Sequence, residues 1–269
     1  MSQVDLTFGP AVSLQRTGAI ATVTLDRGDG RNALSRAVLR DLTAAADWLS
    51  RDTVSSVVVL TSAGAFTAGA DLKDPERGTE GGITRVEQRQ LMRLGPDMCA
   101  AWERLEQITI AAIEGYCIGG GVALAVACDH RVLAEGAHLR LPEIPLGMNM
   151  SWQTNPRTVA LIGPSRAKRL TILGEKLEAA TALDWGLVDE VVPDGDTRVA
   201  AQALAARYAA VPPLALRMTK QAINMAAMPL AQATSFMDRD QFAYAATSSD
   251  QAEAIQAFLD KRTPRFKGD

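Results

Sequence analysis

Three consecutive glycines, Gly119-Gly120-Gly121, separate an apolar run typical of a buried strand from small apolar residues typical of a helix, residues 109–113 and 122–127. Glycine lets a backbone approach another group closely, and the first turn of a helix leaves N–H groups without partners. Such a junction suits a negative charge, either a bound phosphate or an oxyanion that develops during a reaction. These alternatives predict different functions, and the rest of the sequence has to separate them.

The composition limits the class of protein. With 269 residues the chain is long enough for one large α/β domain, or for one with a helical appendage. A hydrophobic content of 47% with 22% charged residues is typical of a soluble globular protein. The net charge of −3 provides no electrostatic basis for binding nucleic acid or an anionic membrane. We therefore expect neither partner.

The cysteines and the apolar runs predict a cytoplasmic protein. Cys99, Cys117 and Cys128 are too few and too scattered for a disulfide framework or a zinc site, so we expect reduced core thiols and no metal. Residues 1–10 lack the basic and apolar regions of a secretory signal. No apolar run approaches the roughly 20 residues that cross a bilayer.

The order of predicted elements divides the chain in two. Strands are predicted at 12–14, 20–25, 57–60, 131–134, 138–141 and 187–192, with the β-branched run 57–60 typical of a parallel strand covered on both faces. Helices are predicted at 86–105 (with a possible break at Gly95-Pro96), 164–173, 179–185, 200–210, 214–227, 230–248 and 251–259. We therefore expect a strand–strand–helix core over 1–198 and a helical region over 199–269.

A second glycine-bearing turn, residues 68–72, follows the strand 57–60. Two such turns can act together as a pair of backbone donors, which favours an oxyanion over a phosphate. With the segment 31–34 (Arg-Asn-Ala-Leu) and Pro142-Glu143, the two turns resemble the enoyl-CoA hydratase/isomerase (crotonase) superfamily from about Val12 onward. The resemblance implies an α/β fold, with a ββα-superhelix (spiral) core and a C-terminal helical trimerisation region. It also implies homotrimers, often paired into hexamers.

The resemblance also implies a chemistry. Members of the family bind acyl-CoA thioesters and stabilise an enolate-like oxyanion with two backbone N–H groups, which correspond here to those of Ala70 and Gly120. Coenzyme A is then part of the substrate, and no other cofactor is expected. The segments around the first turn would wrap the CoA moiety, with basic side chains near its phosphates; the residues concerned are Arg31, Ala33, Ala68, Asp71, Leu72 and Lys73.

The acid/base residues separate the reactions within the family. In the hydratases two glutamates flank the substrate double bond, and the matching positions here hold Ala123 and Glu143. Alanine can neither position water nor transfer a proton, whereas one carboxylate suffices to move a proton from the α- to the γ-carbon of a 3-enoyl-CoA. We therefore expect isomerase-type proton transfer by Glu143, and an apolar pocket would raise its pKa towards the working range.

Several alternatives stay open. Glu143 alone can support slow hydration, the chain can be a non-catalytic CoA-ester binder, or Glu143 can simply pair with Arg140 or cap a turn. The family also includes decarboxylases, dehalogenases and thioester hydrolases. A dinucleotide-binding oxidoreductase is not supported, because the glycines do not follow G-x-G-x-x-G and the sequence contains no P-loop.

The remaining candidates have weaker signals. Trp152 lies in a stretch, 148–153, that replaces a glycine-rich helix start common in hydratases, so it either lines the acyl pocket or is ordinary core. Both histidines are expected to be structural or at the surface, and Asp71 to accept backbone N–H bonds in its own turn. Two acids in or beside the predicted loop 73–84, Glu80 and Glu87, are expected to be solvated. By resemblance, C-terminal residues approach a neighbouring subunit's CoA: Phe258, Lys261 and Phe266.

Overall fold

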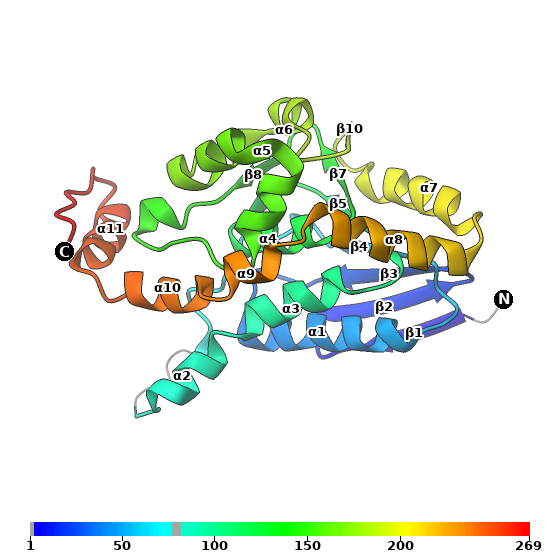
Figure 1. Ribbon diagram of the computed structural model, residues 1–269, viewed down its shortest axis with the longest axis horizontal. Coiled ribbons are helices and arrows are strands. Elements are labelled where there is room, and N and C mark those ends of the chain that lie inside the picture. Colours follow the sequence, from blue (N-terminus) through cyan, green and yellow to red (C-terminus); the bar gives the residue numbers. More distant parts are fainter. Residues whose placement is uncertain (1–2, 77–81) are drawn as a thin grey trace.

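The computed structural model describes residues 3–76 and 82–269. Within these residues, seven strands form one sheet in the order β1-β2-β3-β4-β5-β7-β10 (Figure 1). Their bounds are Gln3–Thr7 (β1), Val12–Thr17 (β2), Ile20–Leu25 (β3), Val57–Ser62 (β4), Ile108–Ile113 (β5), His130–Ala134 (β7) and Glu190–Val192 (β10). The first three strands are antiparallel, and the pairs from β3 to β10 are parallel. The predicted β2–β3 hairpin is confirmed, whereas β1 was not predicted.

A second, smaller sheet explains the predicted strand–strand–helix repeat. It contains β6 (Tyr116–Ile118), β8 (His138–Arg140) and β9 (Leu177–Glu178). The chain passes from β5 through β6 into helix α4 (Gly120–Ala127). It then passes from β7 through β8 into the 3₁₀ turn η2 (Ile144–Leu146) and helix α5 (Thr154–Leu173). Before α4 and again before α5, a strand of the large sheet is thus followed by a strand of the small one, as expected for the spiral core.

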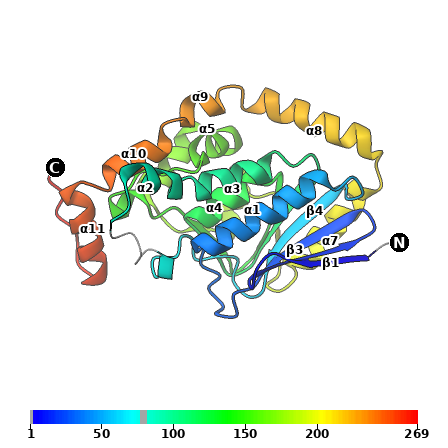
Figure 2. The same ribbon diagram turned by 90° about the horizontal axis from the view of Figure 1, so that it is seen from below.

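The large sheet is covered on both faces, because alternate residues of its central strands point in opposite directions. Val58 and Leu60 of β4 belong to the main core, which also takes in helices α1 (Arg36–Arg51), α3 (Leu94–Glu103) and α4. Val57 and Val59 pack on the other face with Ala201 of α7 (Thr197–Ala209). The continuous β-branched run therefore lies in a doubly covered parallel strand, as predicted. Figure 2 shows α1 and α7 on the two sides of the strands.

The helical segment before β5 differs from the prediction in the place of its break. It divides into α2 (Arg85–Leu91) and α3, so the break lies at residues 92–93 and not at Gly95-Pro96. Pro96 is tolerated because it is the third residue of α3, where its missing N–H would have no partner within the helix. Part of the predicted loop 73–84, residues 77–81 with Glu80, lies outside the described residues.

After β10 the described chain contains helices and no strand, as predicted. Helix α6 (Ala179–Trp185) precedes β10, and the helices that follow β10 are α7, α8 (Pro213–Ala227), α9 (Ala231–Ser235), α10 (Asp238–Ala245) and α11 (Ser249–Leu259). The predicted helix 230–248 is divided at Phe236-Met237. Helix α11 packs against η2 of the same chain, with the Gln251 Cα atom 2.5 Å from where a β-carbon on Gly147 would lie. The division at residue 198 remains a prediction, and α7 packs against the sheet.

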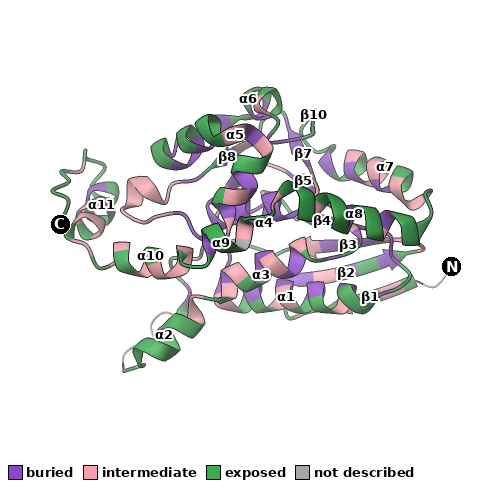
Figure 3. Cartoon of the chain, in the orientation of Figure 1, coloured by how far each residue is buried: buried purple, intermediate pink, exposed green. Residues whose placement is uncertain are grey.

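Helix α8 exposes much of its surface, as the green ribbon in Figure 3 shows. Leu214, Met218 and Met225 on this helix are each more than 60% exposed. Among the described residues, no single helix is long and apolar enough to cross a bilayer. Helices α7 and α8 reach that length and composition only as a pair, which is bent by 109°.

Candidate active site

The two glycine-bearing turns lie side by side. Thr67 pairs with Cys117 as a parallel bridge, since the Ile118 N–H donates to the Thr67 carbonyl at 3.1 Å. The next residue but one, Gly69, has a φ of 82°, and a β-carbon there would lie only 2.5 Å from the Ile118 carbonyl oxygen. A larger residue at position 69 would force the turns apart, so glycine is required for this close approach.

Each turn presents a backbone N–H group that is not used within the part of the protein that the structure describes. Leu34 donates to the Gly69 carbonyl at 2.7 Å and accepts from the Asp71 N–H at 3.1 Å, which leaves the N–H of Ala70 between them. Gly120 is the first residue of α4, where N–H groups have no partner inside the helix. Over residues 3–76 and 82–269, neither N–H donates a hydrogen bond. These are the two groups that the sequence predicts as oxyanion donors.

The Glu143 carboxylate lies beside the start of α4. Its Oε1 atom is 2.6 Å from the position that a β-carbon on Gly119 would take, and Gly119 has a φ of 54°. Its Oε2 atom is buried and has no hydrogen-bond partner among the described residues. Burial raises the pKa of Glu143 to about 7. The carboxyl group can therefore gain or lose a proton near neutral pH.

The structural alternatives for Glu143 are not found among the described residues. The Arg140 side chain donates its Nε–H to the Gly174 carbonyl at 2.8 Å and does not pair with Glu143. Glu143 precedes η2, but its side chain makes no capping hydrogen bond. The Met148 N–H bonds to the backbone carbonyl of Glu143 and not to its carboxylate.

No second carboxylate lies at the position expected in hydratases. Ala123 is fully buried on α4, one turn after Gly120. Glu87 caps α2 by accepting from the Thr84 N–H at 2.7 Å and from the Thr84 hydroxyl, and these bonds lower its pKa. In the part of the chain that the structure describes, no group of three or more His, Cys, Asp or Glu side chains is arranged to hold a metal.

The predicted CoA-binding segments are joined by a residue that the sequence did not single out. The Arg27 guanidinium donates to Asp71 at 2.7 Å and to the Ala33 carbonyl at 2.5 Å. Ala68 donates to the carbonyl of Arg31 at 2.9 Å, so the two segments lie together. Asp71 also accepts from the N–H two residues further on, which confirms its turn-forming role. The remaining predicted residues lie at the surface: Arg31, Ala70, Leu72 and Lys73.

The side chain of Trp152 also lies beside the start of α4. A β-carbon on Gly120 would collide with the six-membered part of its indole ring. Trp152 is half-buried and packs against the main core, as the core alternative predicts, while its place in an acyl pocket stays a prediction. Its place beside the oxyanion candidate results from contacts that single-sequence patterns do not reveal.

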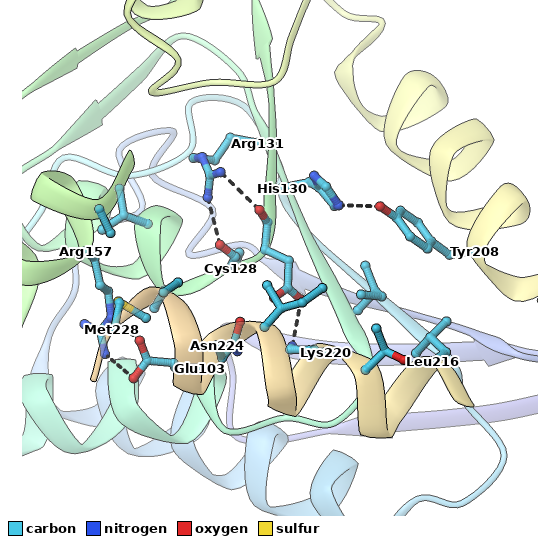
Figure 4. A pocket seen from close by; sticks show the side chains of 18 of the residues that line it. Glu103, Cys128, His130, Arg131, Arg157, Tyr208, Leu216, Lys220, Asn224 and Met228 are labelled. Carbon is cyan, nitrogen blue, oxygen red and sulfur yellow. Dashed lines mark hydrogen bonds and ion pairs between the residues drawn. The ribbon is translucent and has the colours of Figure 1, made fainter. Parts of the chain in front are cut away.

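A separate cavity of about 590 Å³ lies between α8 and the far end of α4 (Figure 4). None of the predicted site residues lines it. Its charged groups are already paired: Lys220 with Asp129 at 2.7 Å, and Arg157 with Glu103 at 2.8 Å. His130 bonds to the Tyr208 hydroxyl at 2.7 Å, in keeping with a structural role. The cavity therefore lacks the unpaired acid/base group found at Glu143.

The cysteines do not supply a nucleophile. All three are buried and free of disulfides, as predicted for core thiols. Burial raises the pKa of Cys99 and of Cys128 to about 12, and that of Cys117 well above its usual value. A thiol of this kind stays protonated and unreactive near neutral pH.

Comparison with known proteins decides the family. The family model described as enoyl-CoA hydratase/isomerase matches residues 15–269. The chain belongs to this family. It is an enzyme of the hydratase/isomerase class that acts on CoA thioesters, and its fold is the crotonase fold.

Relatives in the enoyl-CoA hydratase/isomerase family cover nearly the whole chain. A 2,3-dehydroadipyl-CoA hydratase of Escherichia coli is 36% identical over 95% of this chain and 98% of its own length. An enoyl-CoA isomerase/hydratase of Mycosarcoma maydis is also 36% identical, over 96% of each chain. The crystal structure of carnitinyl-CoA hydratase from Mycobacterium avium has a TM-score of 0.82 at 32% identity, covering 96% of this chain and 99% of that one. Hydratase and isomerase names both occur among these relatives.

Proposed function

We propose that this enzyme isomerises enoyl-CoA thioesters by a single-carboxylate proton transfer. Glu143 removes the α-proton of a 3-enoyl-CoA and returns it at the γ-carbon, which moves the double bond into conjugation with the thioester. One observation carries the proposal: the Glu143 carboxylate lies beside Gly119 with its Oε2 atom buried and without a partner among the described residues, while the second hydratase position holds the buried Ala123.

The backbone supplies the electrostatic part of the proposed reaction. Removing the α-proton places negative charge on the thioester oxygen, and the N–H groups of Ala70 and Gly120, which donate no hydrogen bond within the described chain, are suited to donate to it as an oxyanion hole. The N-terminus of α4 adds a favourable dipole at Gly120. One preorganised donor of this type typically lowers the barrier by about 3–4 kcal/mol.

The state of Glu143 suits a proton shuttle. A base works best when its pKa lies near the operating pH, because it must both accept the proton and release it. Burial raises the pKa of Glu143 to about 7, which meets this requirement. The same carboxyl group then holds the proton between its removal and its return, with no second acid.

Hydration by Glu143 alone is the second candidate, and the hydratase names among the relatives favour it. In that reaction Glu143 would activate water without the usual second glutamate, so we expect it to be slow. A CoA-ester binder without catalysis is the third candidate. The Oε2 atom of Glu143, buried without a partner among the described residues, argues against it, because burying an unpaired polar atom is costly.

We propose that no cofactor is needed beyond the CoA of the substrate, and that the chain assembles as a homotrimer or hexamer in the cytoplasm. The exposed apolar side chains of α8 support an intersubunit surface. Treatment with a metal chelator is expected to leave the rate unchanged, because the proposed reaction uses one carboxylate and two N–H groups.

The deciding experiment assays a 3-enoyl-CoA and crotonyl-CoA separately, with the wild type and with Glu143→Gln. We expect isomerisation of the 3-enoyl-CoA, little hydration of crotonyl-CoA, and a loss of about 100-fold or more in the variant. Rapid hydration of crotonyl-CoA without isomerisation would contradict the isomerase proposal and favour the hydratase. Binding of CoA esters with neither reaction would favour the binder.

A further inference from the structure

Trp152 and Gln153 form an unusual pair in the backbone. Their φ angles are 61° and 57°, so two consecutive residues with side chains adopt the left-handed conformation. Residues other than glycine rarely do so, because the β-carbon approaches the following carbonyl oxygen. Such strain persists only where surrounding contacts enforce it, and it is concentrated at functional sites.

Contacts from distant segments enforce this conformation. The Arg157 guanidinium donates to the Trp152 carbonyl at 2.8 Å and forms a two-bond ion pair with Glu103 of α3, at 2.8 and 3.0 Å. Figure 4 shows Arg157 directed at Glu103. From α10, the Asp238 carboxylate accepts the Gln153 N–H at 2.7 Å. The turn is therefore held by α3, α5 and α10 together.

The enforced turn places the indole ring between two helix backbones. One edge of the ring lies on Gly120 at the start of α4, and the other lies on Gly95 in α3. A β-carbon on either glycine would overlap ring atoms of Trp152. The two glycines thus make room for the ring, and the ring fills the gap between α3 and α4 beside the Gly120 N–H.

We propose that Trp152 limits the length of the acyl group, so that the enzyme prefers short-chain acyl-CoA thioesters. This inference depends on the proposed function, because that function places the thioester oxygen at the Gly120 N–H. The acyl chain then begins next to Gly120, against which the indole ring lies. The ring closes the gap between α3 and α4, and an acyl chain longer than a few carbons meets it.

Arg157 is a positioning residue in this arrangement. Its side chain is almost fully buried, and it acts through the Trp152 carbonyl and not on the substrate. A lysine at position 157 would keep the charge but lose the planar fork that binds Glu103. We expect Arg157→Lys to loosen the turn and to weaken the chain-length limit without removing the carboxylate of Glu143.

The test measures binding of saturated thioesters, which cannot react, so its outcome does not depend on turnover. Calorimetry would compare butyryl-CoA with decanoyl-CoA for the wild type, Trp152→Ala, Trp152→Phe and Arg157→Lys. Where a chain enters an apolar pocket, each added methylene tightens binding by about fourfold. We expect the wild type to show no such gain for decanoyl-CoA, Trp152→Ala to bind it at least tenfold more tightly than the wild type does, and Trp152→Phe to resemble the wild type.

Other outcomes would overturn the inference. If the wild type binds decanoyl-CoA more tightly than butyryl-CoA by the full methylene increment, Trp152 does not limit the chain. If Trp152→Ala folds and its chain-length preference is unchanged, the ring contributes only to the hydrophobic core. Should this variant fail to fold, Trp152→Leu and the wild-type series decide the matter. A wild type that selects short chains but does not isomerise a 3-enoyl-CoA would contradict the proposed isomerisation, whereas the placement of the thioester oxygen at Gly120, on which this inference rests, would stand.

Discussion

The carboxylate of Glu143 lies against the backbone of Gly119, with Oε1 only 2.6 Å from the position of a β-carbon on that glycine. Gly119 immediately precedes Gly120, whose N–H at the start of α4 donates to no group among the described residues. The proposed proton acceptor and one proposed oxyanion donor are therefore organised by neighbouring residues of one turn. Any change that shifts this turn acts on both.

Gly119→Ala is expected to remove most of the activity. The new methyl group would meet the Glu143 carboxylate, and alanine also disfavours the φ of 54° by about 1 kcal/mol or more. The measurement is turnover of a 3-enoyl-CoA together with thermal unfolding. Gly186→Ala is the matched control, because its φ is 81° but a β-carbon there would meet only the Leu161 carbonyl oxygen at 3.8 Å. Equal activities in the two variants would show that Gly119 has no special relation to the base.

The pH dependence of kcat/KM is expected to report the ionisation of Glu143. The base must be deprotonated in the free enzyme, and its pKa is raised to about 7 by burial. The rate constant should therefore rise about tenfold per pH unit below 7 and level off above it. A steady-state pH series with a 3-enoyl-CoA tests this, and a profile that is flat between about pH 5 and 8 would exclude Glu143 as the titrating base.

Stability should change with pH in the opposite sense to activity. Because the folded pKa of Glu143 is raised from 4.5 to about 7, the folded protein holds this proton more tightly than the unfolded chain does. The stability gained from protonation is complete below pH 4.5 and is lost as the pH rises to about 7. Relative to the wild type, Glu143→Gln should gain up to about 3 kcal/mol in the free energy of unfolding over that range. Urea unfolding at several pH values measures the difference in unfolding free energy between the two proteins. A difference that does not change with pH would contradict the raised pKa of Glu143.

Arg27→Ala is expected to raise KM for the thioester about tenfold, with a smaller change in kcat. The substitution removes the hydrogen bonds to Asp71 and to the Ala33 carbonyl, and each partly buried acceptor left unpaired costs about 1–3 kcal/mol. Steady-state kinetics gives the two constants separately. Arg166→Ala is a suitable control, since this exposed arginine lies on α5 beside Trp185. An unchanged KM in Arg27→Ala would mean that these segments do not bind CoA.

Sedimentation is expected to show a trimer or hexamer. The apolar side chains of Leu214, Met218 and Met225 lie along one side of α8, where they would be buried between subunits. Met218→Glu should shift the mass towards the monomer while the circular dichroism spectrum is kept. A wild type that sediments as a monomer at micromolar concentration would remove this proposal.

The fold was predictable where local pattern and burial agree. The run Val57-Val58-Val59-Leu60 indicated a strand covered on both faces, and alternate residues do pack on opposite sides of the sheet. The glycine triplet indicated a strand-to-helix junction because its conformational requirements are local. The break between α2 and α3 was misplaced because a proline is as compatible with a first helical turn as with a kink.

The site was predictable only in part. Motif positions located Glu143 and the two N–H groups, but the roles of these groups remain predictions. The environment of the carboxylate depends on how η2 lies against the start of α4, and this packing cannot be predicted from the local sequence pattern. The left-handed turn at Trp152 depends on Arg157 and on Asp238, more than eighty residues away. The link from Arg27 to Asp71 spans 44 residues for the same reason.

The position of α11 against η2 has a kinetic consequence. The turn that carries Glu143 is supported at Gly147 by Gln251, more than a hundred residues later, while the facing donor at Ala70 is held by Leu34. Contacts that close such long loops form late in folding, after local helices and hairpins. When denatured protein is diluted into buffer, helical structure should therefore return before the reaction centre is complete. Catalytic competence would be among the last properties that the refolding chain recovers.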